Sequence, residues 1–405
     1  MKKVVNVIII VITVITILIP TTIAFMAAQN EPVRLGIDNI DQYQHLFVGK
    51  RIGLITNQTG VNSQLQSTVD VLYEKTDLVA LFSPEHGLRG NAEAGADIGA
   101  AVDMKTGLPV YSLYGDTKKP TAAMLENIDV LCFDIQDVGT RFYTYMSTMA
   151  LAMESAKEHN KLFVVFDRPN PIGGLAVEGP VLKAGFESFI GMYPIPIRHG
   201  LTIGELALLF NQQFGINCNL AVVKLSGWQR SMYWQDTGLP WVMTSPNIPT
   251  PETALVYPGT GLLGATNISE GIGTTRPFEL VGASWLNAAA AADRLNDRQL
   301  PGVYFRPTYF TPRFGRHSGI NQGGVQIHVL DKQAYRPVLT AMTMLAVMKD
   351  LSGGQFAYQS ERMFDLPLGE SDLRLGLEPT EQLLQRWERE ASDFQEKSRQ
   401  YYLYK

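Results

Sequence analysis

Short apolar runs alternate with amphipathic segments over the first half of the chain. The runs have the length and β-branched content of buried strands, and the segments between them place apolar residues at helical spacing. We predict strands over residues 51–56, 78–82, 108–113, 130–135, 162–166 and 220–225, and helices over residues 64–74, 120–127, 143–159 and 202–214. Strands and helices that alternate in this way favour an α/β fold with a mostly parallel sheet and right-handed crossovers.

The pattern changes after Trp241. Residues 244–264 are rich in Pro, Gly and Thr, and they predict a long ordered crossing between two domains. Beyond this crossing we predict strands over 303–310 and 324–330, and helices over 284–296, 332–351 and 381–401. These elements indicate a smaller α+β domain. We therefore divide the chain into an N-terminal segment at 1–30, a catalytic sheet domain at 31–255 and a smaller C-terminal domain at 256–405.

The N-terminal segment has the pattern of an export signal. Lys2 and Lys3 precede an apolar run from residue 4 to about residue 26, which is long enough to span a bilayer. The residues at the end of this run match a cleavage site poorly, so both a signal peptide and an uncleaved anchor stay open. Either interpretation predicts an exported protein, extracellular, periplasmic or associated with the cell envelope, that touches the membrane only through this segment.

Composition argues against several classes of partner. The 405 residues carry a formal net charge of −5 and no basic run, so we expect no nucleic acid partner. Cys132 and Cys218 show no metal-ligand spacing, and the sequence does not decide whether they pair. The string Gly259-x-Gly261-x-x-Gly264 matches a dinucleotide fingerprint but lies outside the first strand–helix turn, where that fingerprint belongs. We predict no cofactor and no metal.

Polar side chains follow four of the predicted strands at the point where each strand ends. The stretch 83–90 holds an acid, an imidazole and a guanidinium, at Glu85, His86 and Arg89. The other sets are Asn57 with Gln58, Asp134 with Asp137 and Arg141, and Asp167 with Arg168 and Asn170. The carboxyl ends of parallel strands share one edge of a sheet, so we expect these sets to meet in one crevice. Asp134 stands between two apolar residues, and we expect it to be a buried structural carboxylate.

The predicted crevice holds carboxylates, guanidiniums and amides. The sequence lacks the G-x-S-x-G elbow, the P-loop and the H-E-x-x-H pair. A carboxylic acid that protonates a leaving oxygen, among groups that stabilise positive charge on a sugar, is typical of a glycosidase. The same inventory fits a protein that binds an acidic sugar without cleaving it. On the residues alone, both interpretations stay open.

Long motifs along the chain resemble one protein family. They are SPEHGLRG at 83–90, FDIQDVGTRFYTY at 133–145, DRPNP at 167–171, EGP at 178–180, YPIPIRHGLTIGELA at 193–207, SPNIPT at 245–250 and TNISEGIGTTRPFE at 266–279. In this order they resemble the NamZ-type exo-β-N-acetylmuramidases. The resemblance implies a Rossmann-like domain, a smaller C-terminal domain and a cleft between them. It also implies release of N-acetylmuramic acid from the non-reducing end of peptidoglycan fragments, with Glu85 in the motif associated with catalysis.

The implied activity gives the candidate acids their roles. Glu85 is the expected general acid, since the apolar residues before it favour a protonated carboxyl, and His86 orients it or contacts the sugar. Asp137 and Glu270 are the candidates for a second catalytic carboxylate. The carboxylate spacing separates a retaining enzyme (about 5 Å) from an inverting one (roughly 6.5–9.5 Å), and assistance by the substrate's acetamido group is a third mechanism that the sequence leaves open.

The remaining candidates are expected to bind the substrate. Muramic acid carries a lactyl carboxylate, which a guanidinium can hold with two hydrogen bonds. The candidate cations are Arg89, Arg141, Arg168 and Arg276, and the other candidates are Asn57, Tyr143, Asn170 and His199. Tyr143 is equally compatible with a core position, and His199 with a contact to the helix that follows it. The alternative function is a non-catalytic muropeptide-binding cell-wall protein that uses the same cleft.

Overall fold

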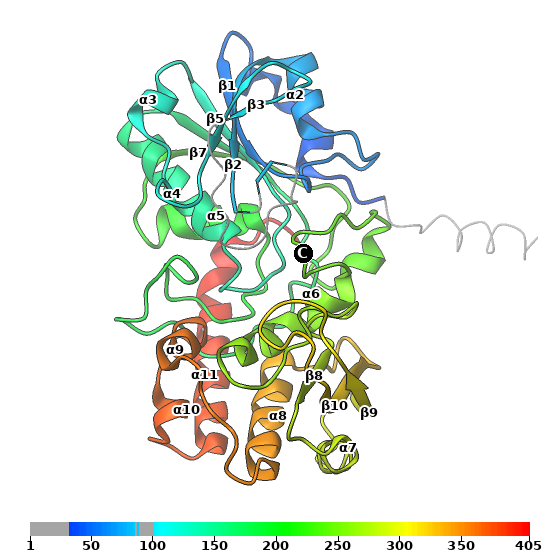
Figure 1. Cartoon of the computed structure of the whole chain (residues 1–405). Coiled ribbons are helices and arrows are strands. Elements are labelled where there is room, and N and C mark those ends of the chain that lie inside the picture. The colour runs from blue at the N-terminus through cyan, green and yellow to red at the C-terminus, as the bar shows by residue number, and fades with distance from the viewer. Residues whose placement is uncertain (1–31, 86, 89–100) are drawn as a thin grey trace, which may run out of the picture.

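The computed structural model describes residues 32–85, 87–88 and 101–405, and its first domain is built on a seven-stranded sheet (Figure 1). The strands are β1 (Arg51–Thr56), β2 (Asp77–Ser83), β3 (Ala101–Val102), β4 (Pro109–Ser112), β5 (Val130–Asp134), β6 (Leu162–Phe166) and β7 (Asn219–Val223). Their order is β3-β4-β2-β1-β5-β6-β7, and only the β3–β4 pair is antiparallel. The six parallel strands follow the order of a dinucleotide-binding fold, with the switch point between β1 and β5. The predicted α/β class is confirmed.

Helices cover both faces of this sheet. On one face lie α3 (Ala122–Leu125), α4 (Tyr145–Glu158) and α5 (Ile203–Gln212); on the other lie the 3₁₀ helix η1 (Gly36–Leu46) and α2 (Thr68–Lys75). Neighbouring strand residues divide between the two cores: Ile55 packs with α4 and α5, whereas Leu54 packs with η1 and α2. Strands that are covered on both faces consist of nearly continuous apolar residues, which is why the sequence located them well.

The start of α5 is fixed beside the end of β6. The Thr202 hydroxyl accepts a hydrogen bond from the Glu205 backbone N–H (3.2 Å), and the Glu205 carboxylate accepts one from the Thr202 N–H (3.1 Å). This is the capping box that Thr202 and Glu205 predict. Asp167, which follows β6, accepts hydrogen bonds from the Thr202 hydroxyl (2.9 Å) and the Gly204 N–H (2.8 Å). The polar end of β6 is therefore built into the fold.

The second domain packs helices around a small antiparallel sheet (Figure 1). In the described chain this sheet has the order β8-β10-β9, formed by β8 (Leu280–Ala283), β9 (Val303–Phe310) and β10 (Gln322–Val329). The helices are α6 (Pro251–Thr260), η3 (Gly261–Ala265), α7 (Ala288–Asn296), α8 (Pro337–Leu351), α9 (Glu361–Leu368), α10 (Asp372–Leu375) and α11 (Thr380–Ser398). The expected smaller α+β domain is confirmed.

The crossing between the domains contains a helix that the sequence did not reveal. α6 begins at Pro251, and the Thr250 side chain caps it by accepting a hydrogen bond from the Thr253 N–H (3.2 Å). The glycines and prolines of this stretch lower its helix propensity, so tertiary packing must supply the stability. A Cβ at Gly259 would lie 2.0 Å from the backbone oxygen of Pro337 at the start of α8. The glycine string therefore allows close packing of α6 on α8.

The end of the chain returns to the first domain. The Tyr404 hydroxyl donates a hydrogen bond to Asp167 Oδ2 (2.6 Å), and the Leu403 N–H donates one to Glu205 Oε1 (2.9 Å). The guanidinium of Arg230 lies 3.5 Å from the ring centre of Tyr402. These contacts hold the last residues of the predicted C-terminal domain against α5 and the end of β6.

Cys132 and Cys218 are buried free thiols, so they do not form the disulfide that the sequence left open. Across residues 32–85, 87–88 and 101–405, no helix is both long enough and apolar enough to cross a membrane.

Candidate functional site

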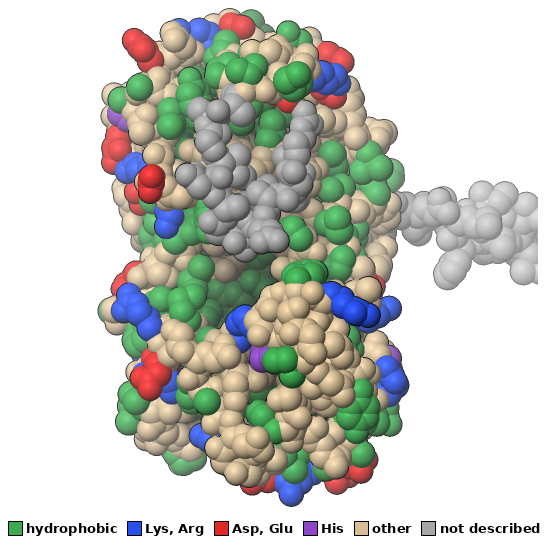
Figure 2. All heavy atoms as spheres, in the orientation of Figure 1, with side chains coloured by type: hydrophobic (Ala, Val, Ile, Leu, Met, Phe, Trp, Pro, Cys, Tyr) green, Lys and Arg blue, Asp and Glu red, His purple; other side chains and the backbone are tan. Residues whose placement is uncertain are grey.

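The carboxyl ends of the parallel strands face the second domain. Figure 2 shows this side of the molecule hollowed between the two domains, with hydrophobic side chains in the hollow and Lys and Arg side chains at its edges. Asn57 follows β1, Glu85 lies two residues after β2, and Asp137 lies three residues after β5. Asp167 follows β6 directly, so all four predicted polar sets begin at neighbouring strands, β2-β1-β5-β6, of one sheet edge. His86 and Arg89 lie outside the described residues.

Glu85 is held at the start of a helix. The Thr144 hydroxyl donates a hydrogen bond to Glu85 Oε2 (2.7 Å). Thr144 is the N-cap residue of α4, but within the described chain its side chain makes no capping bond to that helix. The hydroxyl that ordinarily caps a helix is therefore directed to Glu85. The carboxylate therefore faces both a hydrogen-bond donor and the positive end of the α4 dipole.

Three tyrosines line the space around Glu85. Burial, together with the negative charge of Glu85, raises the pKa of Tyr114 to about 12. Burial is also the main cause that raises the pKa values of Tyr145 and Tyr257, and the charge of Glu85 adds to both. The Tyr145 hydroxyl donates a hydrogen bond to the backbone oxygen of Thr244 (2.7 Å). The Glu85 carboxylate is thus surrounded by the neutral side chains of Tyr114, Tyr145 and Tyr257, which we call the aromatic wall. Tyr145 joins this wall to the interdomain segment through Thr244.

Asp137 has a different environment. Its Oδ1 accepts a hydrogen bond from the Gly139 N–H (2.8 Å), whereas its Oδ2 is buried without a partner in the described part of the chain. Burial raises the pKa of Asp137 to about 7. Tyr257 lies near both acids, because the charges of Glu85 and Asp137 each add to the effect of burial on its pKa. The site therefore contains one carboxyl that accepts a hydrogen bond at a helix start and one that burial keeps protonated up to about pH 7.

Asn57 and Tyr143 belong to the same wall as Glu85. The Asn57 side chain lies beside Tyr145 and is fixed by the Thr59 N–H, which donates to its Oδ1 (2.9 Å). The ring of Tyr143 meets the ring of Tyr145 at 4.9 Å between centroids and that of Tyr257 at 5.9 Å. The structure therefore brings both predicted substrate contacts to the crevice, although both side chains are buried.

Asn170 and His199 brace the loops behind Asp137. The Asn170 amide donates a hydrogen bond to the Leu201 backbone oxygen (3.0 Å), and the Leu201 N–H donates one to His199 Nδ1 (3.1 Å). A Cβ at Gly139 would lie 2.4 Å from Asn170 Oδ1, so Asn170 packs directly against the turn that holds Asp137. Burial and nearby arginine charges lower the pKa of His199 to about 3, which makes it a neutral imidazole. These placements favour positioning roles over direct substrate contact.

Arg141 ties the domains together. Its side chain is fully buried, and its two terminal nitrogens donate four hydrogen bonds of 2.6–2.8 Å to backbone oxygens. The acceptors are Pro180 and Ile195 of the first domain and Pro367 and Leu368 of α9. This is a correction to the expectation that Arg141 faces a substrate carboxylate. The four carbonyl acceptors come from distant parts of the chain in both domains, so the sequence around Arg141 does not reveal this structural role.

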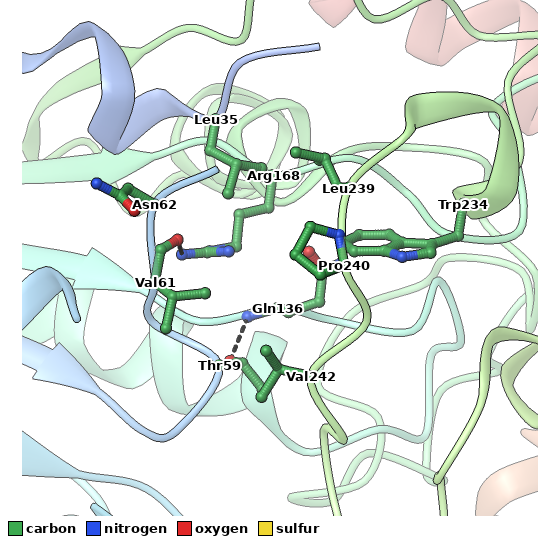
Figure 3. Close-up of a pocket in the computed structure, with 10 residues that line it drawn as sticks. All are labelled: Leu35, Thr59, Val61, Asn62, Gln136, Arg168, Trp234, Leu239, Pro240 and Val242. Atoms are coloured by element: carbon green, nitrogen blue, oxygen red, sulfur yellow. Dashed lines mark hydrogen bonds between the residues drawn. The ribbon is translucent and has the colours of Figure 1, made fainter. Parts of the chain in front are cut away.

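Arg168 lies at the edge of a small pocket beneath the switch point of the sheet (Figure 3). Its guanidinium pairs with Asp134 (2.5 and 2.9 Å) and donates to the backbone oxygen of Val61 (2.8 Å). Asp134 is completely buried, which confirms the structural role expected for it. The pocket is lined by Leu35, Thr59, Val61, Asn62, Gln136, Arg168, Trp234, Leu239, Pro240 and Val242. The ion pair makes Arg168 a support for this pocket, so most of its donors are already used.

Glu270 and Arg276 come from one loop of the second domain but have different settings. Glu270 is buried and pairs with Arg316. Its backbone oxygen accepts a hydrogen bond from the Phe278 N–H (2.6 Å), and the Phe278 ring meets Tyr257 at 4.8 Å. The side chain of Arg276 is 55% exposed and pairs with a neighbouring glutamate at 2.8 Å. Of the predicted cations that the structure describes, Arg276 is the exposed one.

Comparison with known proteins gives the family. Residues 52–252 match the family model described as the N-terminal part of the exo-β-N-acetylmuramidase NamZ, and residues 255–404 match the model of its C-terminal part. The chain belongs to the NamZ family. The peptidoglycan β-N-acetylmuramidase NamZ of Bacillus subtilis (strain 168) is 50% identical over 383 residues, which cover 93% of this chain and 92% of that protein. The resemblance seen in the motifs is confirmed.

Two solved structures share the NamZ-family fold of this chain. A DUF1343 family protein of Bacteroides fragilis NCTC 9343 is 43% identical and superposes with a TM-score of 0.85, covering 92% of this chain and 99% of that protein. A second DUF1343 family protein of the same strain is 29% identical, with a TM-score of 0.76 and coverage of 93% and 99%. The arrangement of both domains is therefore common to these relatives.

Several residues of this NamZ-family site escaped the sequence analysis. Thr144 and Tyr257 surround Glu85, and Arg316 neutralises Glu270. A threonine before a predicted helix is an N-cap signal, so Thr144 was detectable as a cap, although its use by Glu85 was not. Among the described residues, no group of three or more His, Cys, Asp or Glu side chains is arranged to hold a metal ion. What the described site offers chemically is acid, base and hydrogen-bond donors.

Proposed function

We propose that this NamZ-family chain is an exo-β-N-acetylmuramidase, a glycoside hydrolase that releases β-1,4-linked N-acetylmuramic acid from the non-reducing end of peptidoglycan fragments. Family membership and the 50% identity to the peptidoglycan β-N-acetylmuramidase of Bacillus subtilis support the activity. The observation that carries the proposal in the structure is the pair Glu85 and Asp137. Glycoside hydrolysis uses a pair of carboxyl groups, one of which carries a proton, and here two carboxyls lie near the same tyrosine, with the pKa of Asp137 raised to about 7.

The environments of Asp137 and Glu85 suggest catalytic roles that differ from those expected from the sequence, where Glu85 is the general acid. Asp137, with its unpartnered Oδ2 and a pKa of about 7, is the group that keeps a proton for the glycosidic oxygen. Glu85, with the Thr144 hydroxyl and the start of α4 beside it, is the charged group that faces the developing oxocarbenium ion. The apolar residues before Glu85 suggested the reverse assignment, because the helix start and its hydroxyl come from a distant part of the chain.

Selectivity for muramic acid requires a cation near the non-reducing sugar. Arg141 and Arg168 are themselves buried, so we assign this role to Arg276, whose side chain is 55% exposed at the second-domain loop that carries Glu270. An Arg276→Met variant should bind the muramic substrate more weakly, because the lactyl carboxylate loses a charged hydrogen-bond donor. The expected result is a higher KM for muramic substrates with the turnover rate largely kept.

Product analysis tests the proposed reaction directly. Incubation with a glycan of defined length, followed by mass spectrometry, should show free N-acetylmuramic acid as the first product and a chain shortened by one sugar. Release of disaccharides or internal fragments would show an endo-acting enzyme. Binding of muropeptides without any product would favour the non-catalytic cell-wall protein.

We also propose that the protein is exported and contributes to cell-wall turnover. The support is the N-terminal pattern of Lys2, Lys3 and a long apolar run, together with a substrate that lies outside the cytoplasmic membrane. Fractionation of cells that express the full chain should place the protein outside the cytoplasm. Mass spectrometry of its N-terminus then distinguishes a cleaved signal peptide from an anchor, and recovery in the cytoplasm would contradict export.

A further inference from the structure

A short hairpin projects an aromatic ring to the edge of the site. Ser188 and Gly191 exchange two backbone hydrogen bonds (2.9 and 3.0 Å), so Phe189 stands at the tip of a tight turn. The base of this segment is anchored to the second domain, where the Lys183 N–H donates to the backbone oxygen of Gly369 (2.9 Å). Its ammonium pairs with an acid of α10 at 2.6 Å. The base of this first-domain segment is thus held by the second domain, and its tip lies against the first domain.

The tip of the hairpin contacts Tyr114, one of the tyrosines of the aromatic wall around Glu85. The ring centroids of Phe189 and Tyr114 lie 6.3 Å apart with an interplanar angle of 55°. The Lys118 ammonium lies 4.6 Å from the centre of the Phe189 ring. Tyr114 is also the tyrosine whose hydroxyl stands beside Glu85. A continuous path therefore leads from the catalytic carboxylate through Tyr114 to Phe189 and Lys118.

Core packing does not account for this group. Across the described residues, both hydrophobic cores form without Phe189 or Tyr114, and both rings are half-buried. Lys118 is exposed. An aromatic ring that is partly open to solvent and held in place by a cation has the properties of a ligand platform. The C–H faces of a sugar ring are apolar enough to pack on such a ring, while its hydroxyls remain in water.

We propose that Phe189, supported by Tyr114 and Lys118, forms the aglycone subsite, which binds the sugar on the reducing-end side of the cleaved bond. This inference rests on the proposed function and adds the position of the leaving sugar. An exo-acting enzyme encloses the terminal sugar and leaves the rest of the glycan pointing outward. The path from Glu85 to the exposed Lys118 runs in that outward direction, and the positive charge suits a glycan whose next residues carry carboxylates.

Two substrates that differ only in the aglycone test the subsite. One is the methyl β-glycoside of N-acetylmuramic acid, whose aglycone is too small to reach Phe189, and the other is the disaccharide in which N-acetylglucosamine is the aglycone. Phe189→Ala should lower kcat/KM for the disaccharide about tenfold, the size of one lost aromatic contact, and leave the methyl glycoside within about twofold. Lys118→Met, which keeps an unbranched apolar chain, should produce a smaller loss on the disaccharide alone.

The control variant, Tyr309→Ala, removes an aromatic ring that is 67% exposed on β9, and it should change neither substrate. If Phe189→Ala lowers both substrates equally, or lowers neither, the subsite is wrong while the proposed function stands. If the wild-type protein cleaves neither substrate, the proposed function fails and the subsite fails with it.

Discussion

Arg141 offers a sharp test of the structure, because its buried position predicts a stability defect where the sequence suggested a binding defect. Replacement by Met keeps an unbranched apolar chain of similar length and removes the guanidinium. Four backbone oxygens of the two domains then lose their donors. A buried polar group left unpaired costs roughly 1–3 kcal/mol, so the simple sum of about 4–12 kcal/mol is comparable to the whole stability of many domains.

Two effects reduce that sum. The variant no longer buries a charge, and the cost of that burial is visible in the native protein, where desolvation lowers the pKa of Arg141 to about 9. Water that enters a slightly opened interface can also satisfy some of the carbonyls. Removing one partner of a buried charged network typically costs about 3–5 kcal/mol, and we expect Arg141→Met to lower the free energy of unfolding by about 4 kcal/mol.

Urea unfolding followed by tryptophan fluorescence measures this loss. The matched control is Arg294→Met, because its side chain is 52% exposed and its ion-pair partner Asp350 is 70% exposed, and a surface ion pair of this kind should contribute less than about 1 kcal/mol. An Arg141→Met protein as stable as the wild type, with a raised KM for muramic substrates, would refute the structural role and restore the substrate contact.

Three further predictions concern the site and the packing behind it. Asp137→Asn should lower kcat by a factor of about 10²–10⁴, because the variant lacks the proposed general acid. Wild-type activity should fall as pH rises through about 7, since the Asp137 carboxyl is protonated only below its pKa, and this fall should be absent in the variant. A variant whose activity still falls through about pH 7 would contradict the role of Asp137 as the acid. Thr144→Val should lower kcat about 10- to 100-fold, because the Glu85 carboxylate loses its hydrogen bond from the Thr144 hydroxyl. Circular dichroism and the melting temperature are the controls for folding. An unchanged kcat would show that this hydrogen bond does not contribute to catalysis. Gly259→Ala should destabilise the second domain by at least about 2 kcal/mol, measured by calorimetry, because the added methyl group meets the Pro337 carbonyl. A melting temperature equal to that of the wild type would show that α6 and α8 are less tightly packed than described.

Local patterns were sufficient for most of the sheet domain. The strands β1, β2, β5 and β6 are buried along most of their length, so continuous apolar runs marked them, and the Thr202–Glu205 box marked the start of α5. The two-residue strand β3, whose Val102 is 61% exposed, gave no such run and was not predicted. α6 was missed because Gly259 and Pro258 in its last turn are poor helix formers. Its stability comes from contact with α8, which lies about eighty residues further along the chain. Tertiary packing of this kind leaves little local signal.

In the candidate site, too, the sequence identified features that have a local signal and missed those that depend on distant residues. Strand-end acids such as Glu85 and Asp137 were recognisable because a parallel sheet gathers its carboxyl ends at one edge. The partners that set their chemistry were not recognisable. The Thr144 hydroxyl reaches Glu85 across 59 positions of sequence, and the acceptors of Arg141 lie up to 227 positions away. Residue type alone could not separate an arginine that binds substrate from one that holds two domains together.

The most direct test of the central claim is release of a chromophore from a β-linked N-acetylmuramic acid glycoside, measured beside the matching N-acetylglucosamine glycoside for the wild-type protein and Glu85→Gln. We predict that the wild type cleaves the muramic substrate and spares the other, and that Glu85→Gln loses this activity while its melting temperature stays close to that of the wild type. Equal cleavage of both substrates would contradict the specificity. Full activity in Glu85→Gln would contradict the placement of the catalytic site.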